Sequence, residues 1–97
     1  MIYVYTQPGC VPCKYAIAHL ERSNTDFEVI DIHLDGDAYR YVTEDKKAKS
    51  TPVIEREDSE GRSLGVIFGY AAPEQRKLRE WIELENPNQD EDGIWLD

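Results

Sequence analysis

The chain has 97 residues, a length that fits one compact domain able to bury its own core. Its composition, 40% hydrophobic and 32% charged, is typical of a globular chain and excludes a disordered one. Of the net charge of −9, residues 80–97 contribute seven acids and no base, which leaves 13 acids against 11 bases in residues 1–79. Neither part has the basic excess that nucleic acid or an anionic membrane requires, so we expect no such partner.

The N-terminal segment predicts a buried first strand. Residues 2–6 are β-branched and aromatic, and the run stops at Pro8-Gly9. So short an apolar run, without a basic leader, is neither a signal peptide nor a membrane span. We therefore expect a cytoplasmic protein.

Residues 11–23 predict the helix that follows this strand. Ile17 and Leu20 recur at helical spacing, and Pro12 suits a first helical turn, where its missing N–H costs nothing. Residues 27–32 then predict a second strand. Because a single helix joins the two strands, we expect them to pair in parallel as a βαβ unit.

The second half of the chain predicts a short helix, a hairpin and a last helix. Asp37 or a neighbour can cap the short helix, and the stretch 58–61 favours a hairpin loop. Leu78, Trp81 and Ile82 lie three and four apart and give the last helix a buried stripe. The expected ranges are 38–48 for the short helix, 53–56 and 64–68 for the strands, and 73 to about 86 for the last helix.

The composition changes near the C-terminal end. We expect a domain over residues 1–84 and an acidic tail over residues 85–97. The tail contains an apolar cluster, Ile94-Trp95-Leu96, of the kind that docks a terminus. Docking on the chain's own domain and docking on a partner both remain open.

The two cysteines of the chain are separated by two residues and stand between the first strand and its helix. Cys10 and Cys13 in this context favour redox chemistry. A structural disulfide over so small a loop would stabilise little. A zinc site is a further alternative, but His19 and His33 have the wrong spacing for its remaining ligands. Lys14 stands where haem attachment would need a histidine. We therefore expect no metal and no bound cofactor.

The position of the pair predicts the role of each sulfur. Cys10 precedes the helix, where unpaired N–H groups and the helix dipole favour a thiolate, so we assign it as the nucleophile. Cys13 falls in the first helical turn, where a more buried thiol would resolve the mixed disulfide. Lys14 could add positive charge, although a lysine on a helix surface is more often merely solvated.

Three segments resemble the glutaredoxin branch of the thioredoxin superfamily over residues 1–84. The segment 5–13, YTQPGCVPC, is similar to the family's active site, and Thr51-Pro52-Val53 is similar to its cis-proline segment. Gly69-Tyr70 lies where the family has a glycine-containing turn before the last helix. The resemblance implies an α/β, thioredoxin-like fold, with a four-stranded mixed sheet, three helices and the order βαβαββα. It also implies a cis bond between Thr51 and Pro52.

The same resemblance implies which residues contact a partner and which reductant serves the chain. The implied partner-binding residues are Val11, Pro12, Thr51, Pro52, Gly69 and Tyr70. Glutathione-using members commonly carry a lysine where this chain has Gln7, and an acid in the turn where this chain has Ala71-Ala72. Val11-Pro12 between the cysteines is also nearer to the NrdH-type redoxins, although those proteins tend to have a charged residue before Pro73.

The sequence thus favours an NrdH-type thiol–disulfide oxidoreductase. The resemblance implies recharging by thioredoxin reductase and electron donation to ribonucleotide reductase or another disulfide-containing protein, and we expect a monomer. A glutathione-dependent glutaredoxin is the first alternative. A non-catalytic module that docks on a larger enzyme is the second.

Overall fold

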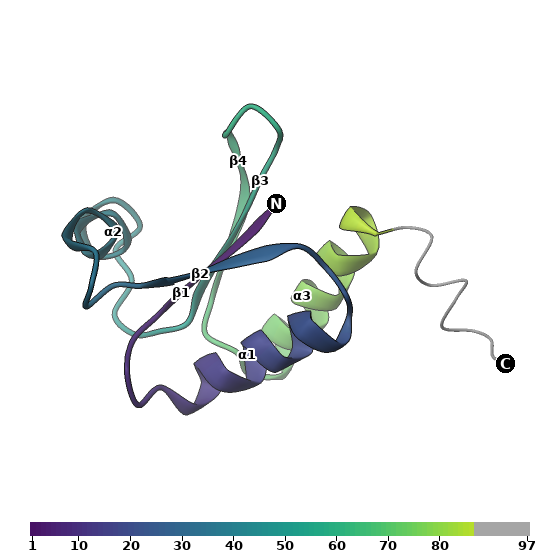
Figure 1. Ribbon diagram of the computed structural model, residues 1–97, viewed down its shortest axis with the longest axis horizontal. Helices are drawn as coiled ribbons and strands as arrows, with labels where there is room; N and C mark the ends of the chain where they lie inside the picture. The colour runs from purple at the N-terminus through teal and green to yellow at the C-terminus, as the bar shows by residue number, and fades with distance from the viewer. Residues whose placement is uncertain (87–97) are drawn as a thin grey trace, which may run out of the picture.

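A four-stranded mixed sheet in the order β2-β1-β3-β4 forms the centre of the chain in a computed structural model that describes residues 1–86 (Figure 1). The predicted order βαβαββα and the mixed sheet are confirmed. The elements are β1 (Ile2–Thr6), α1 (Val11–Arg22), β2 (Phe27–Asp31), α2 (Gly36–Arg40), η1 (Tyr41–Asp45), β3 (Val53–Glu57), β4 (Ser63–Phe68) and α3 (Ala72–Glu85). The tail cluster around Trp95 lies outside the described residues.

Strand β1 has a partner on both sides. It pairs in parallel with β2 and antiparallel with β3, with Val4 opposite Val29 and Ile54 respectively. Ile2 and Val4 are fully buried, as expected of a central strand. Strand β2 is an edge strand, and Val29 in its middle is exposed. The parallel pair is the predicted βαβ unit.

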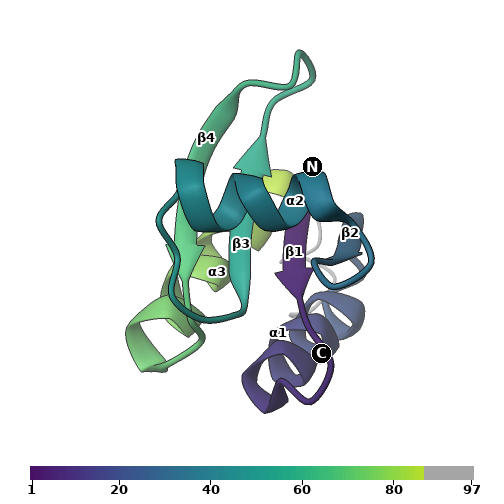
Figure 2. The same ribbon diagram turned by 90° about the vertical axis from the view of Figure 1, so that its left-hand side faces the viewer.

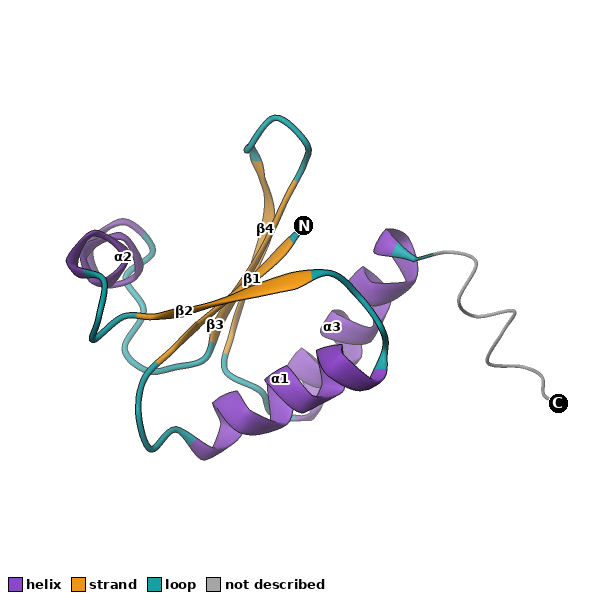
Figure 3. Cartoon of the chain, in the orientation of Figure 1, coloured by secondary structure: helices purple, strands orange, loops and turns teal. Residues whose placement is uncertain are grey.

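Helices α1 and α3 lie side by side on one face of the sheet (Figures 1 and 3). The stripe of α3 is buried as predicted, and in α1 Leu20 is fully buried whereas Ile17 lies at the margin of the core. This larger core consists of Ile2, Val4, Ala16, Leu20, Ile54, Ile67, Leu78, Trp81 and Ile82. It fixes the direction of α1, whose first residue, Val11, directly follows Cys10.

Helix α2 and the π-helical turn η1 cover the other face and cross over β1 and β3 (Figure 2). Asp35, not Asp37, caps α2, because its carboxylate accepts the N–H of Ala38 at 3.1 Å. The helical segment also ends before residue 48. Lys47 adopts a left-handed φ of 57°, and the N–H of Ala48 closes back on the carbonyl of Val42 at 2.9 Å.

A buried carboxylate ties η1 to the sheet. The side chain of Glu55 on β3 is fully buried and accepts the hydroxyl of Tyr41 at 2.7 and 2.8 Å. The ammonium of Lys46 lies 3.5 Å from the same carboxylate. Burial and the hydrogen bond to Glu55 raise the pKa of Tyr41, so its hydroxyl stays a donor. These contacts hold the segment that leads into the 46–52 loop.

The β3–β4 hairpin projects from the end of the sheet opposite the cysteines (Figure 1). Its loop is the predicted one, and Asp58 organises it by accepting the N–H groups of Glu60 and Arg62, both at 2.9 Å. Within residues 1–86, every helix is too short or too polar to cross a lipid bilayer.

Replacing Gly65 by alanine is expected to lower the free energy of unfolding by about 1–3 kcal/mol, because a methyl group there overfills the contact between β4 and α3. The added Cβ would lie 3.0 Å from Cζ2 of buried Trp81. Urea unfolding of both proteins measures the difference. The control is Gly36→Ala, whose Cβ would meet nothing closer than 4.0 Å and should change stability by less than about 1 kcal/mol. An unchanged stability for Gly65→Ala contradicts the tight packing described here.

Candidate active site

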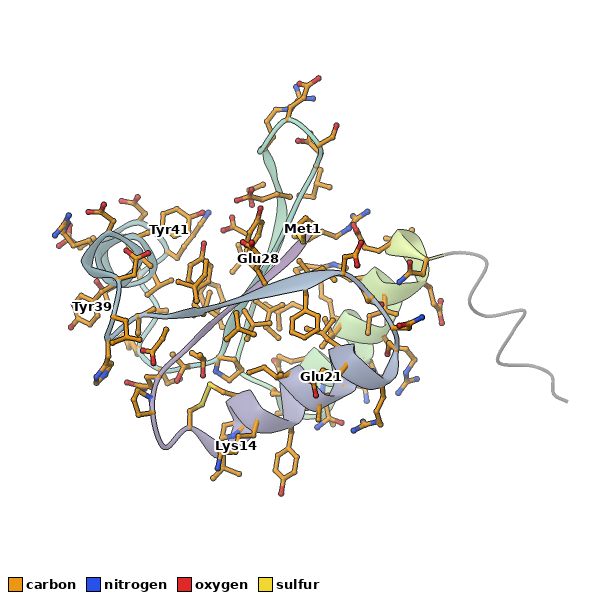
Figure 4. The ribbon with its side chains drawn as sticks, viewed as in Figure 1. Met1, Lys14, Glu21, Glu28, Tyr39 and Tyr41 are labelled. Carbon is orange, nitrogen blue, oxygen red and sulfur yellow. A yellow bond between two sulfur atoms is a disulfide. The ribbon has the colours of Figure 1, made fainter. Side chains whose placement is uncertain are left out.

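The cysteine pair occupies the junction between β1 and α1. Cys10 is the N-cap of α1, and Pro12 falls in the first turn, as predicted. Gly9 takes a left-handed φ of 78°, which turns the chain from the strand into the helix. Cys10 and Cys13 form a disulfide, seen in Figure 4 as the yellow bond at the start of α1 near Lys14. The structure therefore represents the oxidised form.

The two sulfurs have different surroundings. Cys13 is 1% exposed, whereas Cys10 is partly exposed. The backbone N–H of Cys13 points at Sγ of Cys10, 3.2 Å away. In the reduced protein the same N–H and the helix dipole would favour a thiolate at position 10. The arrangement thus suits attack by Cys10 and resolution by Cys13, and these roles stay predictions.

The cis-proline segment lies beside residues 7–10, which join β1 to α1 and which we call the active-site loop. The bond between Thr51 and Pro52 is cis, as the resemblance implied, and both residues are buried. The side-chain amide of Gln7 donates to Oγ1 of Thr51 at 3.0 Å. The N–H of Gly69 donates to the carbonyl of Pro52 at 2.9 Å. Three segments far apart in sequence are thereby joined at one end of the sheet.

Tyr70, which the resemblance placed at the partner surface, directs its hydroxyl inward. Its oxygen lies 2.6 Å from Nδ1 of His19 on α1. Burial lowers the pKa of His19, and the nearby charges of Arg22 and Arg79 lower it further. Burial raises the pKa of Tyr70. Both groups are therefore neutral near pH 7, with the tyrosine hydroxyl donating to Nδ1.

The sequence did not predict the contacts that two histidines make near the active site. The spacing of the sequence marks His19 only as a candidate metal ligand, whereas in the structure it connects α1 to the turn that follows β4. The same holds for His33, whose Nε2 lies 3.2 Å from Oε1 of Gln7. Both contacts are long-range, so the local sequence carries no signal for them. Val11 and Pro12 are exposed beside the pair and accessible to a partner.

No group of three or more metal-binding side chains occurs within residues 1–86. The imidazoles of His19 and His33 each contact a different neighbour, at separate points of this end of the fold. Lys14 is exposed on α1, close to the disulfide (Figure 4).

In a comparison with known proteins, residues 2–58 match the Glutaredoxin family model. The Gene 56 protein of Mycobacterium phage L5 is 40% identical over 53 residues, which are 55% of this chain and 52% of that protein. The chain spans little more than half the length of the curated relatives it matches.

Two solved structures share the fold. The thioredoxin-like protein BC3987 is 29% identical with a TM-score of 0.64, and the match covers 80% of this chain and 99% of that one. The glutaredoxin-like protein NrdH-redoxin from Escherichia coli has a TM-score of 0.62, with 77% of this chain and 91% of that one covered. At 22% identity, the second likeness concerns the fold alone.

Lowering the pH from 7.5 to 5.5 is expected to reduce the free energy of unfolding of the original protein by more than it reduces that of the His19→Gln variant. The pKa of His19 lies below 6.5 in the folded chain, so the unfolded chain takes up the proton first as the pH falls. The stability that depends on neutral His19 is complete above about pH 6.5 and is lost below it. Urea unfolding at both pH values gives the two differences. Equal pH sensitivity of the two proteins would show that His19 titrates normally.

Proposed function

This chain belongs to the glutaredoxin family, and we propose that it is a dithiol–disulfide oxidoreductase that reduces disulfides of partner proteins. The observation that carries the proposal is the Cys10–Cys13 pair at the start of α1, beside the cis-proline segment. A partly exposed sulfur above a buried one supports a two-step exchange.

Cys10 acts as a thiolate on one sulfur of the partner disulfide. A bond forms between Cys10 and that sulfur, and the other partner sulfur leaves as a thiolate and takes up a proton. Cys13, having lost its proton, then attacks Sγ of Cys10. The partner leaves as a dithiol, and the Cys10–Cys13 disulfide takes its place, so that two electrons have moved to the partner.

Partner binding is assigned to the residues around the pair. Thr51 and Pro52 would offer backbone to an extended partner chain, while Val11 and Pro12 would contact it from the helix side. The Gly69-Tyr70 turn would border the same surface, because Gly69 is hydrogen-bonded to Pro52. Tyr70 would contribute through its ring and backbone, since its hydroxyl is already paired with His19.

The reductant that we propose is thioredoxin reductase, which makes the chain an NrdH-type redoxin. Gln7 stands where glutathione-using relatives carry a lysine, and both ends of its amide are engaged, with Thr51 and with His33. The N-cap of α3 is Ala71, whose methyl side chain cannot accept a hydrogen bond from an amino group. The two charged side chains with which those relatives hold glutathione are thus absent. Ribonucleotide reductase is the acceptor that the NrdH type implies.

The remaining assignments concern the whole chain. We propose a cytoplasmic monomer whose domain extends past the expected boundary at residue 84 and is followed by an acidic tail. Helix α3 continues to Glu85, whose carboxylate lies 2.7 Å from Arg56 on β3, so the folded part extends at least to that residue.

Thioredoxin reductase with NADPH is expected to reduce the Cys10–Cys13 disulfide far faster than glutathione does. A charge-assisted hydrogen bond contributes about 1.5–3 kcal/mol, so the loss of two weakens glutathione binding by roughly two to four orders of magnitude. The assay follows NADPH consumption with insulin as acceptor, comparing thioredoxin reductase with glutathione plus its reductase at matched potential.

The control for this assay is Cys10→Ser, which should abolish turnover with either system. Faster turnover with glutathione would assign the chain to the glutathione-dependent glutaredoxins. Absence of turnover with both systems would favour the non-catalytic module.

A further inference from the structure

A small pocket borders the active-site loop on the side of α2 and η1. Its volume is about 180 Å³, below the roughly 300–1,000 Å³ of sites for small molecules. Ile32, Val42 and Ala48 contribute its apolar lining, and Gln7 and Thr51 line it next to the cysteine pair. The space suits one side chain better than a whole cofactor. We call it the Lys49 pocket, after its lysine.

The charge of this pocket is opposite to that of the molecule. The chain has 20 acids and 11 bases. Among the nine lining residues, all within the described part of the chain, Lys49 is the only charged one. The preceding acids, Glu44 and Asp45, are exposed and do not line the pocket. Lys46 is paired with Glu55, whereas Lys49 is exposed.

The pocket lies within reach of a partner bound at the disulfide. Gln7 lines it, and the carbonyl of Gln7 accepts the N–H of Cys10 at 3.3 Å. Thr51 lines it as well and directly precedes Pro52. An extended chain advances about 3.3 Å per residue. A partner residue close in sequence to the reacting cysteine would therefore lie near the pocket.

We propose that the Lys49 pocket receives an aspartate or glutamate side chain of the partner polypeptide, close to the cysteine that Cys10 attacks. The ammonium of Lys49 and the hydroxyl of Ser50 would hold the carboxylate, and Val42 and Ala48 would contact its methylene groups. This inference rests on the proposed function and adds a substrate preference to it: acidic disulfide segments are reduced faster than neutral ones.

The test uses two synthetic peptides, each closed by a Cys-Gly-Ser-Cys disulfide. In the first peptide, two glutamates precede the first cysteine and two follow the second cysteine. In the second peptide, glutamines replace these four glutamates. The full chain, reduced beforehand and freed of reductant, is mixed with each peptide at low salt. Each reaction converts the peptide disulfide to two thiols and the Cys10–Cys13 dithiol to a disulfide. Acid quenching and chromatography give the second-order rate constants.

The glutamate peptide is expected to react about three- to tenfold faster than the glutamine peptide, and 0.5 M salt should reduce the ratio. Lys49→Glu should abolish or invert the preference. Lys77→Glu makes the same charge change at an exposed position of α3 outside the pocket, and should retain it. Because the two peptides are compared on the same protein sample, the ratio of their rate constants does not depend on the fraction of that sample that is active.

Equal rates for the two peptides, or a preference that survives Lys49→Glu, would overturn the assignment of the pocket while leaving the proposed function intact. A Lys49→Glu variant that reduces both peptides faster than the original chain would also overturn it. Such a result would mean that Lys49 normally holds an acidic segment of the chain itself and that the substitution releases this segment. If neither peptide is reduced, the proposed function fails, and this inference fails with it.

Discussion

The parallel pairing of β1 with β2 is the constraint on which the active site depends. Two parallel strands joined by one helix require that helix to run back over the sheet, with its N-terminus at the C-terminal end of the first strand. Cys10 is therefore placed at a helix N-terminus by topology. The antiparallel pairing of β1 with β3 then brings the start of β3, and with it Pro52, to the same end. The chemistry is located by backbone pairing before any side chain contributes.

Side chains then fix how the segments at this end lie against one another. Gln7 connects the active-site loop to Thr51, and the backbone of Gly69 connects the last turn to Pro52. The contact of His19 with Tyr70 joins that turn to the helix that carries both cysteines. Each bond links segments distant in sequence and holds one of them in place at the end of the sheet where the cysteines lie. Such positioning is what a two-step exchange between aligned sulfurs requires.

The sequence predicted those features that short-range patterns determine. The strand at residues 2–6, the N-terminal position of Cys10 and the hairpin loop follow from residue type and spacing, and the structure confirms them. The cis bond before Pro52 came from the family resemblance. The sequence left the cap of α2 open between Asp37 and a neighbour, because Asp35 and Asp37 have the same side chain and only the path of the chain selects Asp35.

What the sequence did not predict depends on tertiary contact. Glu55 begins the charged half of β3, and its sequence neighbours give no sign that its side chain is buried against the hydroxyl of Tyr41. The π-helical turn η1, which begins at Tyr41, was not predicted either. Spacing in the sequence bears only on whether His19 and His33 could bind a metal, whereas in the structure each contacts a side chain from a distant part of the chain.

The central claim is that Cys10 attacks a partner disulfide and Cys13 releases the product. Its most direct test is to mix reduced Cys13→Ser protein with excess insulin, quench with acid and map the adduct by mass spectrometry. A mixed disulfide is expected to accumulate at Cys10, because the resolving sulfur is absent. The Cys10→Ser variant should form little or none under the same conditions. An adduct that forms readily at Cys13 of Cys10→Ser, with none at Cys10 of Cys13→Ser, would contradict the assignment of the two sulfurs.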